Sequence, residues 1–560
     1  MVPGGDLSAD ERARVAPYVT DPEGPVFALR GLPEAVKGAL FARYSRSPNS
    51  VRRILLEEFL ADDVTGTATV PVAGVATEVG TDRARELFQR VLADYGDDSV
   101  AQLGGAHVAM EGVSNVLTKV IEWGRLASYL EQSTRYVPYT DQVDGRWKYV
   151  RPPGISAHPQ ILSRYEAVLD DAFATYSRLF GAVLDHLVAE HASGEDDTAS
   201  RRALRARALD AVRGLLPAAT TANLGVYASG QAWEQMIIRL RAHPLTEARE
   251  AGDQVLLALR QVIPDFLTRV DRPDRGGRTG AYRRATEERA AAMWEELAGS
   301  AESVTGTDEV PGTGVGAAGT PVTVTSAALP GVRLLNHDPD GERRVLAHAL
   351  WPESGCTLDE VRSRVDTLDD SAVRTALAQW AAGRADRRER PGRALEATSY
   401  LFEVTCDYGA YRDLQRHRIL TLEAQPLGAD LGWEPSPDVA AAGLAGEFAR
   451  VNEVSAELWR EVLAVVPEEA PYAVTMAHRL RFAMRMNARE AMHLIELRSQ
   501  PQGHAAYRRV AQDMLVAIRD DAGQPGIADL MGFADMSGEG GRLAQERRTE
   551  ARRTADTVDS

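Results

Sequence analysis

The sequence has few cysteines, no long hydrophobic run and a shortage of positive charge. Its two cysteines, Cys356 and Cys406, do not support a disulfide framework or a thiolate metal site, which favours a reducing compartment. No apolar stretch is long enough to span a bilayer, and residues 1–10 lack the basic and apolar regions of a signal peptide. These absences predict a cytoplasmic protein without a membrane partner.

The formal net charge of -17 over 560 residues argues against a general nucleic-acid or anionic-membrane binder, because both need an extended positive face. A phosphate site would therefore have to be a local basic pocket. Three catalytic patterns are also missing: a Gly-rich phosphate loop, a His/Cys cluster with metal spacing, and a Gly-x-Ser-x-Gly nucleophile elbow. We expect no nucleic-acid partner and no metal site.

The length of the chain favours two domains. Composition divides the sequence into an N-terminal extension (1–29), a first domain (30–298), a Gly/Thr/Pro-rich linker (299–325), a second domain (326–536) and a charged tail (537–560). Periodicity predicts helices over 157–192, 200–216, 217–241 and 475–498. Residues 400–406 show alternation and include the β-branched Val404 and Thr405, which predicts a strand. Both domains are therefore predicted to be mainly helical.

A basic stretch follows this predicted strand. Arg416, His417 and Arg418 stand in a row before Thr421. Guanidinium groups form forked hydrogen bonds, and an imidazole can donate or stack, so the stretch could hold a phosphate or an electron-rich ring. A solvated basic turn is the alternative from these letters alone.

A second group of polar residues lies on the later predicted helix. Arg489 and His493 are four apart and share one face, whereas Asn487 and Arg498 share a different one. A single flat site cannot use all four unless it wraps around the helix. The alternative here is an ordinary solvated helix face.

The first domain has its own candidates. Glu131, Ser133 and Arg135 stand at alternate positions, and Arg213 precedes Pro217. Arginine with a serine hydroxyl can hold a phosphate, and a glutamate can order a sugar hydroxyl or a ring N–H. A surface loop of salt-bridged residues explains the same letters.

Together these motifs resemble the flavin-dependent thymidylate synthase family, whose signature is Arg-His-Arg-x-x-Ser followed by a loop ending Ser-x-Arg-Tyr. The chain looks like two such domains in tandem, over about 30–265 and 326–520. The second carries Arg416-His417-Arg418-Ile-Leu-Thr421 but not the nucleotide loop. The first carries the loop, from Glu131 to Tyr136, but only Arg125 and Ser128 of the signature. Each half keeps what the other has lost.

The resemblance implies an α+β fold: two tandem thymidylate-synthase-complementing-type domains, mainly helical with a small antiparallel sheet in each. It implies FAD as cofactor, NADPH and methylenetetrahydrofolate as co-substrates, and dUMP or a related nucleotide as substrate. It also implies a homodimer that forms a pseudo-tetramer. By motif position it assigns flavin binding to Arg416, His417, Arg418, Thr421, Asn487, Arg489, His493, Arg125 and Ser128, nucleotide binding to Glu131, Ser133, Arg135 and Arg213, and catalysis to Arg498.

The complementary losses predict a composite site, with the first half holding the nucleotide phosphate and the second half the flavin. The predicted reaction is reductive methylation of dUMP to dTMP. Two alternatives stay open: a flavoenzyme of the same fold that acts on another nucleotide-like substrate, and a non-catalytic scaffold that retained the fold.

Overall fold

The computed structural model describes residues 7–45, 47–60, 100–191, 198–301, 331–538, 541 and 547. Its contacts divide the chain into two compact units. Unit 1 comprises residues 1–111, 124–131 and 223–300, and unit 2 comprises residues 112–123, 132–222 and 301–560. Most of the predicted linker and of the predicted tail lies outside the described residues, and linker residues 299–301 belong to a helix that ends at Ala301. The domain boundaries inferred from sequence stay a prediction.

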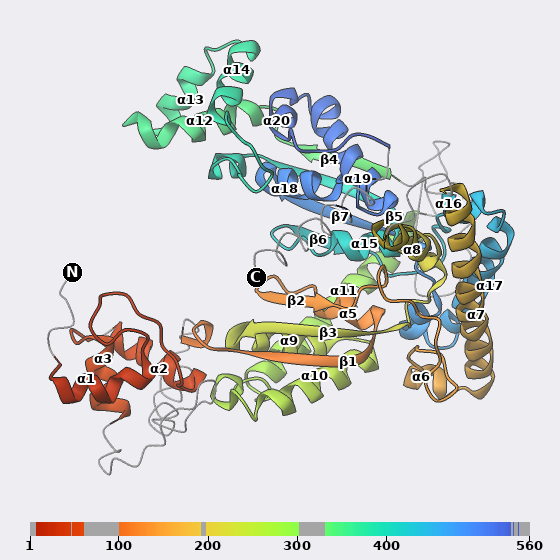
Figure 1. The fold of residues 1–560 in the computed structure, drawn as a ribbon, viewed down its shortest axis with the longest axis horizontal. Helices are drawn as coiled ribbons and strands as arrows, with labels where there is room; N and C mark the ends of the chain where they lie inside the picture. The colour runs from red at the N-terminus through yellow and green to blue at the C-terminus, as the bar shows by residue number, and fades with distance from the viewer. Residues whose placement is uncertain are drawn as a thin grey trace. The chain divides into compact units, whose positions relative to one another are not determined.

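Unit 1 contains an N-terminal group of helices and most of a three-stranded sheet in the order β1-β3-β2 (Figure 1). Side chains of β3 alternate between buried and exposed, so one face of the sheet packs into a core. Trp233 of α9 is buried, and its indole N–H donates to the carbonyl of Ala106 at 3.1 Å, which ties helix to sheet. The elements are α1 (Ala9–Val15), α2 (Glu34–Tyr44), α3 (Val51–Ile54), β1 (Gly105–Ser114), β2 (Ala127–Glu131), β3 (Thr221–Ser229), α9 (Gly230–Ala242), α10 (Thr246–Leu259) and α11 (Gly276–Ala301).

Unit 2 contains an antiparallel four-stranded sheet in the order β4-β5-β7-β6. Its strands are β4 (Gly331–His337), β5 (Ser399–Asp407), β6 (Thr421–Ala424) and β7 (Arg479–Asn487). Its helices are α5 (Asn115–Ile121), α6 (Pro153–Ser156), α7 (Pro159–Glu190), α8 (Thr198–Val212), α12 (Gly341–Ser354), α13 (Leu358–Val365), α14 (Asp370–Trp380), α15 (Tyr408–Leu414), α16 (Pro437–Ala441), α17 (Ala445–Leu463), α18 (Ala488–Arg498), α19 (Ala505–Val516) and α20 (Pro525–Leu530).

Segments from both halves of the sequence build unit 2. Backbone hydrogen bonds join Ala218 N to the carbonyl of Val474 at 2.7 Å and Met476 N to that of Leu216 at 2.9 Å. The hydroxyl of Tyr408 donates to the backbone carbonyl of Asn115 at 2.9 Å. A site in this unit can therefore draw side chains from either half.

Two helix predictions are wrong in the same way. Residues 217–241 form β3 followed by α9, and residues 475–498 form β7 followed by α18. In β7 every second residue from Leu480 to Met486 is buried, and arginines alternate with them at 481 and 485. This period of two is the strand pattern, which the helical period of the following residues obscured. The strand over 400–406 and the helices over 157–192 and 200–216 are confirmed as β5, α7 and α8.

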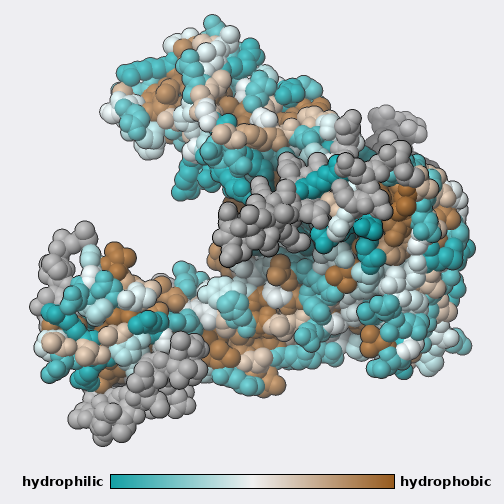
Figure 2. Space-filling model, viewed as in Figure 1, coloured by the Kyte–Doolittle hydropathy of each residue, from teal (hydrophilic) through white to brown (hydrophobic). Residues whose placement is uncertain are grey.

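The α+β class, mainly helical with a small antiparallel sheet in each half, is confirmed. No helix among the described residues is long and apolar enough to cross a membrane. On the face seen in Figure 2, hydrophobic residues form separate groups between hydrophilic ones.

Candidate functional site

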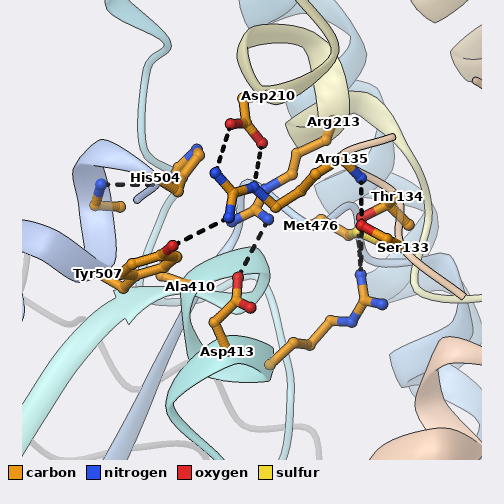
Figure 3. A network of polar contacts seen from close by, with 12 residues as sticks. Ser133, Thr134, Arg135, Asp210, Arg213, Ala410, Asp413, Met476, His504 and Tyr507 are labelled. Carbon is orange, nitrogen blue, oxygen red and sulfur yellow. Dashed lines mark hydrogen bonds and ion pairs between the residues drawn. The ribbon is translucent and has the colours of Figure 1, made fainter. Parts of the chain in front are cut away.

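A buried cluster of charged side chains lies in unit 2 (Figure 3). We call Arg135, Asp210, Arg213, Asp413 and Tyr507 the arginine–aspartate cluster. Arg135 donates from Nε and Nη2 to the two carboxylate oxygens of Asp210 at 2.7 and 2.9 Å, and from Nη1 to the hydroxyl of Tyr507 at 3.0 Å. A forked pair of this kind fixes both side chains. The donors of Arg135 are therefore largely engaged within the protein.

Asp413 lies among several arginines. Its carboxylate is 3.5 Å from Arg213, 3.9 Å from Arg498 and 4.0 Å from Arg416. Burial opposes its ionisation, but these three guanidinium groups and Arg135 lower the pKa of Asp413 to about 2. Four arginines thus face two ionised carboxylates, those of Asp210 and Asp413, and the buried carboxyl of Asp407 also lies beside Arg213.

Arg213 has donor atoms left over. It is 3% exposed, and its Nε and Nη2 atoms are buried without a hydrogen-bond partner among the described residues. A methyl group on Gly409 would lie 3.0 Å from that Nε, so glycine leaves the room that the guanidinium occupies. An unpaired buried donor is costly unless a ligand or water meets it.

A cavity of about 1200 Å³ adjoins Arg213. Its lining includes Asp210, Arg213, the segment from Gln502 to Ala506 that leads into α19, and apolar side chains such as Phe448 and Leu204. Cavities of this size accept cofactor-sized ligands. The cavity therefore offers space for a ligand beside Arg213.

A second group of contacts centres on His417. Its Nδ1 lies 3.0 Å from a carboxylate oxygen of Glu490, and its Nε2 accepts a hydrogen bond from Arg498 Nε at 3.0 Å. The ring centroids of His493 and His417 are 5.1 Å apart. Nδ1 of His493 lies 3.0 Å from Nη2 of Arg390. Burial, followed by Arg498, His493, Arg390 and Arg418, holds the pKa of His417 well below its usual range. Burial also lowers the pKa of His493, to about 4.

The spacing of His417, Glu490 and His493 would suit a metal ion, since their ligand atoms lie within 4.8 Å of one another. The chemistry around them does not. Both nitrogens of His417 already have partners, and the arginines named above surround the two rings. Neutral imidazoles among guanidinium groups suit an electron-rich or anionic group better than a cation.

The remaining predicted residues fall in several places. Arg416 and Thr421 are exposed, Arg418 is half-buried, and Ser133 accepts a hydrogen bond from its neighbour's backbone, Arg135 N. Asn487 ends β7 and caps α18 by accepting from Glu490 N at 2.9 Å, so the argument from helix faces does not apply to it. Arg489 lies 3.6 Å from Glu396, and its Nε is buried without a partner among the described residues.

Three predicted residues belong to unit 1. Arg125 and Ser128 are exposed, Glu131 is buried, and Ser128 and Glu131 stand in β2 opposite Tyr227 and Leu224 of β3. Their roles stay predictions.

Sequence reasoning missed several members of the site. Asp413 stands three residues before Arg416, and Glu490 follows Arg489 directly, so an acidic residue among basic ones is the available signal. Arg390 falls in a basic segment that would ordinarily be solvated. Asp210 and Tyr507 are far from any motif, and only folding brings them to Arg135.

Comparison with known proteins identifies the family. The family model for thymidylate synthase complementing protein matches residues 52–265 and 333–522. A UPF0159 protein of Chlamydia muridarum is 36% identical over 553 residues, 98% of this chain and 99% of that protein. A flavin-dependent thymidylate synthase of Mycolicibacterium gilvum is 30% identical over 182 residues, 32% of this chain and 68% of its own length.

Among solved structures, flavin-dependent thymidylate synthase ThyX from Helicobacter pylori, complexed with FAD and dUMP, aligns with 36% of this chain and 99% of its own. The sequence identity is 17% and the TM-score is 0.28. The family assignment rests on the sequence matches, which cover both halves of the chain. The chain is a double-length member of the thymidylate synthase complementing protein family.

Proposed function

We propose that the protein is a flavin-dependent thymidylate synthase, converting dUMP to dTMP with methylenetetrahydrofolate and reduced FAD at a composite site. One observation carries the proposal: Arg135 and Arg213 from the first half meet Asp413, Arg498 and Tyr507 from the second half within unit 2. The contact supports the prediction from the two partial motifs that both halves contribute residues to one site.

The residues around His417 fit a flavin. His417 and His493 are neutral rings that can stack, Arg418 and Arg390 supply positive charge, and the buried Nε of Arg489 lacks a partner among the described residues. Bound FAD, once reduced by NADPH, would supply the hydride of the reaction. The protein's share is to bind the flavin ring, exclude water and aim Arg498 at the pyrimidine.

For the nucleotide phosphate, Arg213 is a better candidate than Arg135. Arg135 donates to Asp210, Tyr507 and the carbonyl of Gln502, whereas two donor atoms of Arg213 are unpaired. A phosphate that met these donors would be stabilised by charge-assisted hydrogen bonds. Glu131 and Ser133 remain candidates for the sugar and the phosphate.

The first test is the absorption spectrum of the purified protein, with the released chromophore identified, before and after dUMP. We expect bound FAD whose spectrum changes with dUMP, and then tritium release from labelled dUMP in the presence of methylenetetrahydrofolate and NADPH. A colourless protein that fails to take up FAD would overturn the proposal and leave a scaffold. Complementation of a thymidine-requiring strain tests the physiological reaction.

Matched variants assign the two sites. His417→Ala is expected to lower flavin content, and Arg213→Ala to weaken dUMP binding while flavin stays bound. Arg450→Ala is the control, because Arg450 pairs at the surface of unit 2 with Asp171. If Arg213→Ala leaves dUMP affinity at the control's value, the phosphate lies elsewhere.

A second candidate substrate follows from Asp413. This carboxylate occupies the point where arginines converge, which is where a phosphate would otherwise be held. A flavoenzyme of this family that takes a nucleotide-like substrate without a phosphate would suit such a site. Equal affinities for dUMP and deoxyuridine would favour it, and a preference of tenfold or more for dUMP would favour dTMP formation.

A further inference from the structure

The ring of His417 lies between two side chains of one helix, an acidic one, Glu490, and a cationic one, Arg498. Glu490 and Arg498 both belong to α18, about two turns apart, and His417 follows α15. The two contacts of its ring are each 3.0 Å long. His417 is 5% exposed and Glu490 7%, so water does not compete strongly for either contact.

The partners fix which ring nitrogen carries the proton. An arginine Nε–H can only donate, so His417 Nε2 must present its lone pair to Arg498. Because the ring is neutral, its single proton must then be on Nδ1, where it donates to Glu490. The hydrogen bonds run in one direction, from Arg498 through His417 to Glu490.

We propose that Glu490 is a positioning residue, which acts through His417 to hold the guanidinium of Arg498 in its working orientation. Anchored by Nε, Arg498 keeps its two terminal nitrogens for other partners, and one of them lies 3.9 Å from Asp413. The role of Arg498 toward a substrate rests on the proposed function. The proton position and the anchoring of Arg498 do not.

The charged and titratable groups around this relay come from three segments. They are Arg390 from the loop before β5, Arg418 from the segment after α15, and Arg489, His493 and Arg498 from α18. Burial raises the pKa of Glu490 to about 7, although Arg390 and Arg489 act in the opposite direction. The acceptor strength of Glu490 therefore changes near neutral pH, and the relay is tightest when Glu490 is ionised.

The test compares Glu490→Gln, Glu490→Asp and Glu490→Leu. The glutamine keeps an oxygen that accepts from Nδ1, the aspartate withdraws it by one methylene, and the leucine removes it. Glu496→Gln is the control, because Glu496 is buried on the same helix and pairs with Arg384 at 2.8 Å. Nitrogen-15 spectra of histidine-labelled full-length protein, assigned with His417→Asn, report the proton on His417 without any need for activity.

We expect the proton of His417 on Nδ1 in the wild type, in Glu490→Gln and in Glu496→Gln. In Glu490→Leu and Glu490→Asp we expect exchange between tautomers and faster solvent exchange of the Arg498 Nε–H. In the flavin-loaded protein, the same two variants should lower kcat/KM roughly 10- to 100-fold, the loss that is typical when a residue that orients a metal ligand is changed, while Glu490→Gln stays within about threefold at pH 8.

A wild-type proton on Nε2 would overturn the proposal, as would an unchanged Arg498 exchange rate in both Glu490→Leu and Glu490→Asp. If Glu490→Leu does not fold, the aspartate variant decides. If the spectra agree but the protein binds no flavin, the relay is upheld and the proposed function is what fails.

Discussion

Removing Asp210 should destabilise unit 2 strongly, because it would leave Arg135 buried without its carboxylate. The side chains of Arg135 and Asp210 are only 14% and 13% exposed and share two hydrogen bonds. Breaking a buried pair from one side costs about 3–5 kcal/mol, a large part of the ~5–15 kcal/mol that holds a typical protein folded. We therefore expect Asp210→Ala to lower the opening free energy of α8 and α19 by that amount.

Hydrogen exchange measured by mass spectrometry suits this test, since a chain of two units need not unfold in one step. Asp171→Ala is the control, because Asp171 and Arg450 are 42% and 48% exposed and an exposed pair contributes about 0–1 kcal/mol. An equal loss in both variants would refute the reasoning. Inorganic phosphate should stabilise Asp210→Ala more than the wild type, since the vacated carboxylate position leaves Arg135 able to bind an anion.

Two further predictions concern residues beside Arg213. Gly409→Ala should weaken dUMP binding, because the new methyl would lie 3.0 Å from Arg213 Nε. Gly181→Ala within α7 is the control: its methyl meets nothing within 4 Å, so it should leave dUMP binding unchanged and stabilise the protein by about 0.5–1 kcal/mol. Equal dUMP affinities of the two variants in calorimetry, or equal shifts in their thermal melts, would contradict this. Burial raises the pKa of Asp407 to about 6, so the folded protein binds the proton of this carboxyl more tightly than the unfolded chain does. The contribution of Asp407 to the free energy of unfolding therefore falls as pH rises from 4 to 7. Asp407→Asn, which keeps an oxygen to cap α15, should therefore gain stability over the wild type across that window in urea titrations, and a constant difference would exclude the shift.

The sequence predicts the fold class, and it points to several residues of the candidate site but not to all of them, for physical reasons. The basic motif at Arg416–Arg418 and the residue pair Arg135 and Arg213 could be found because each motif is local. The helices expected over 217–241 and 475–498 failed because a strand ends where a helix begins, so two periodicities overlap in one apolar segment. Asp210 and Tyr507 carry no local signal, since their contact with Arg135 exists only after the chain has folded.

In the proposed composite site, covalent fusion would allow each half to lose part of its motif. In unit 2 the first half supplies Arg135 and the second supplies Tyr507 and Asp413, and these residues meet within one chain. Linking the halves makes their encounter intramolecular, so it no longer depends on protein concentration. Each motif position occurs twice in the chain, once in each half. A copy that does not face the arginine–aspartate cluster contributes nothing to it, so losing that copy does not affect the cluster. Among the first-half motif residues, Arg135 and Arg213 contact the second half, so in a composite site these are the residues whose loss the second half could not replace.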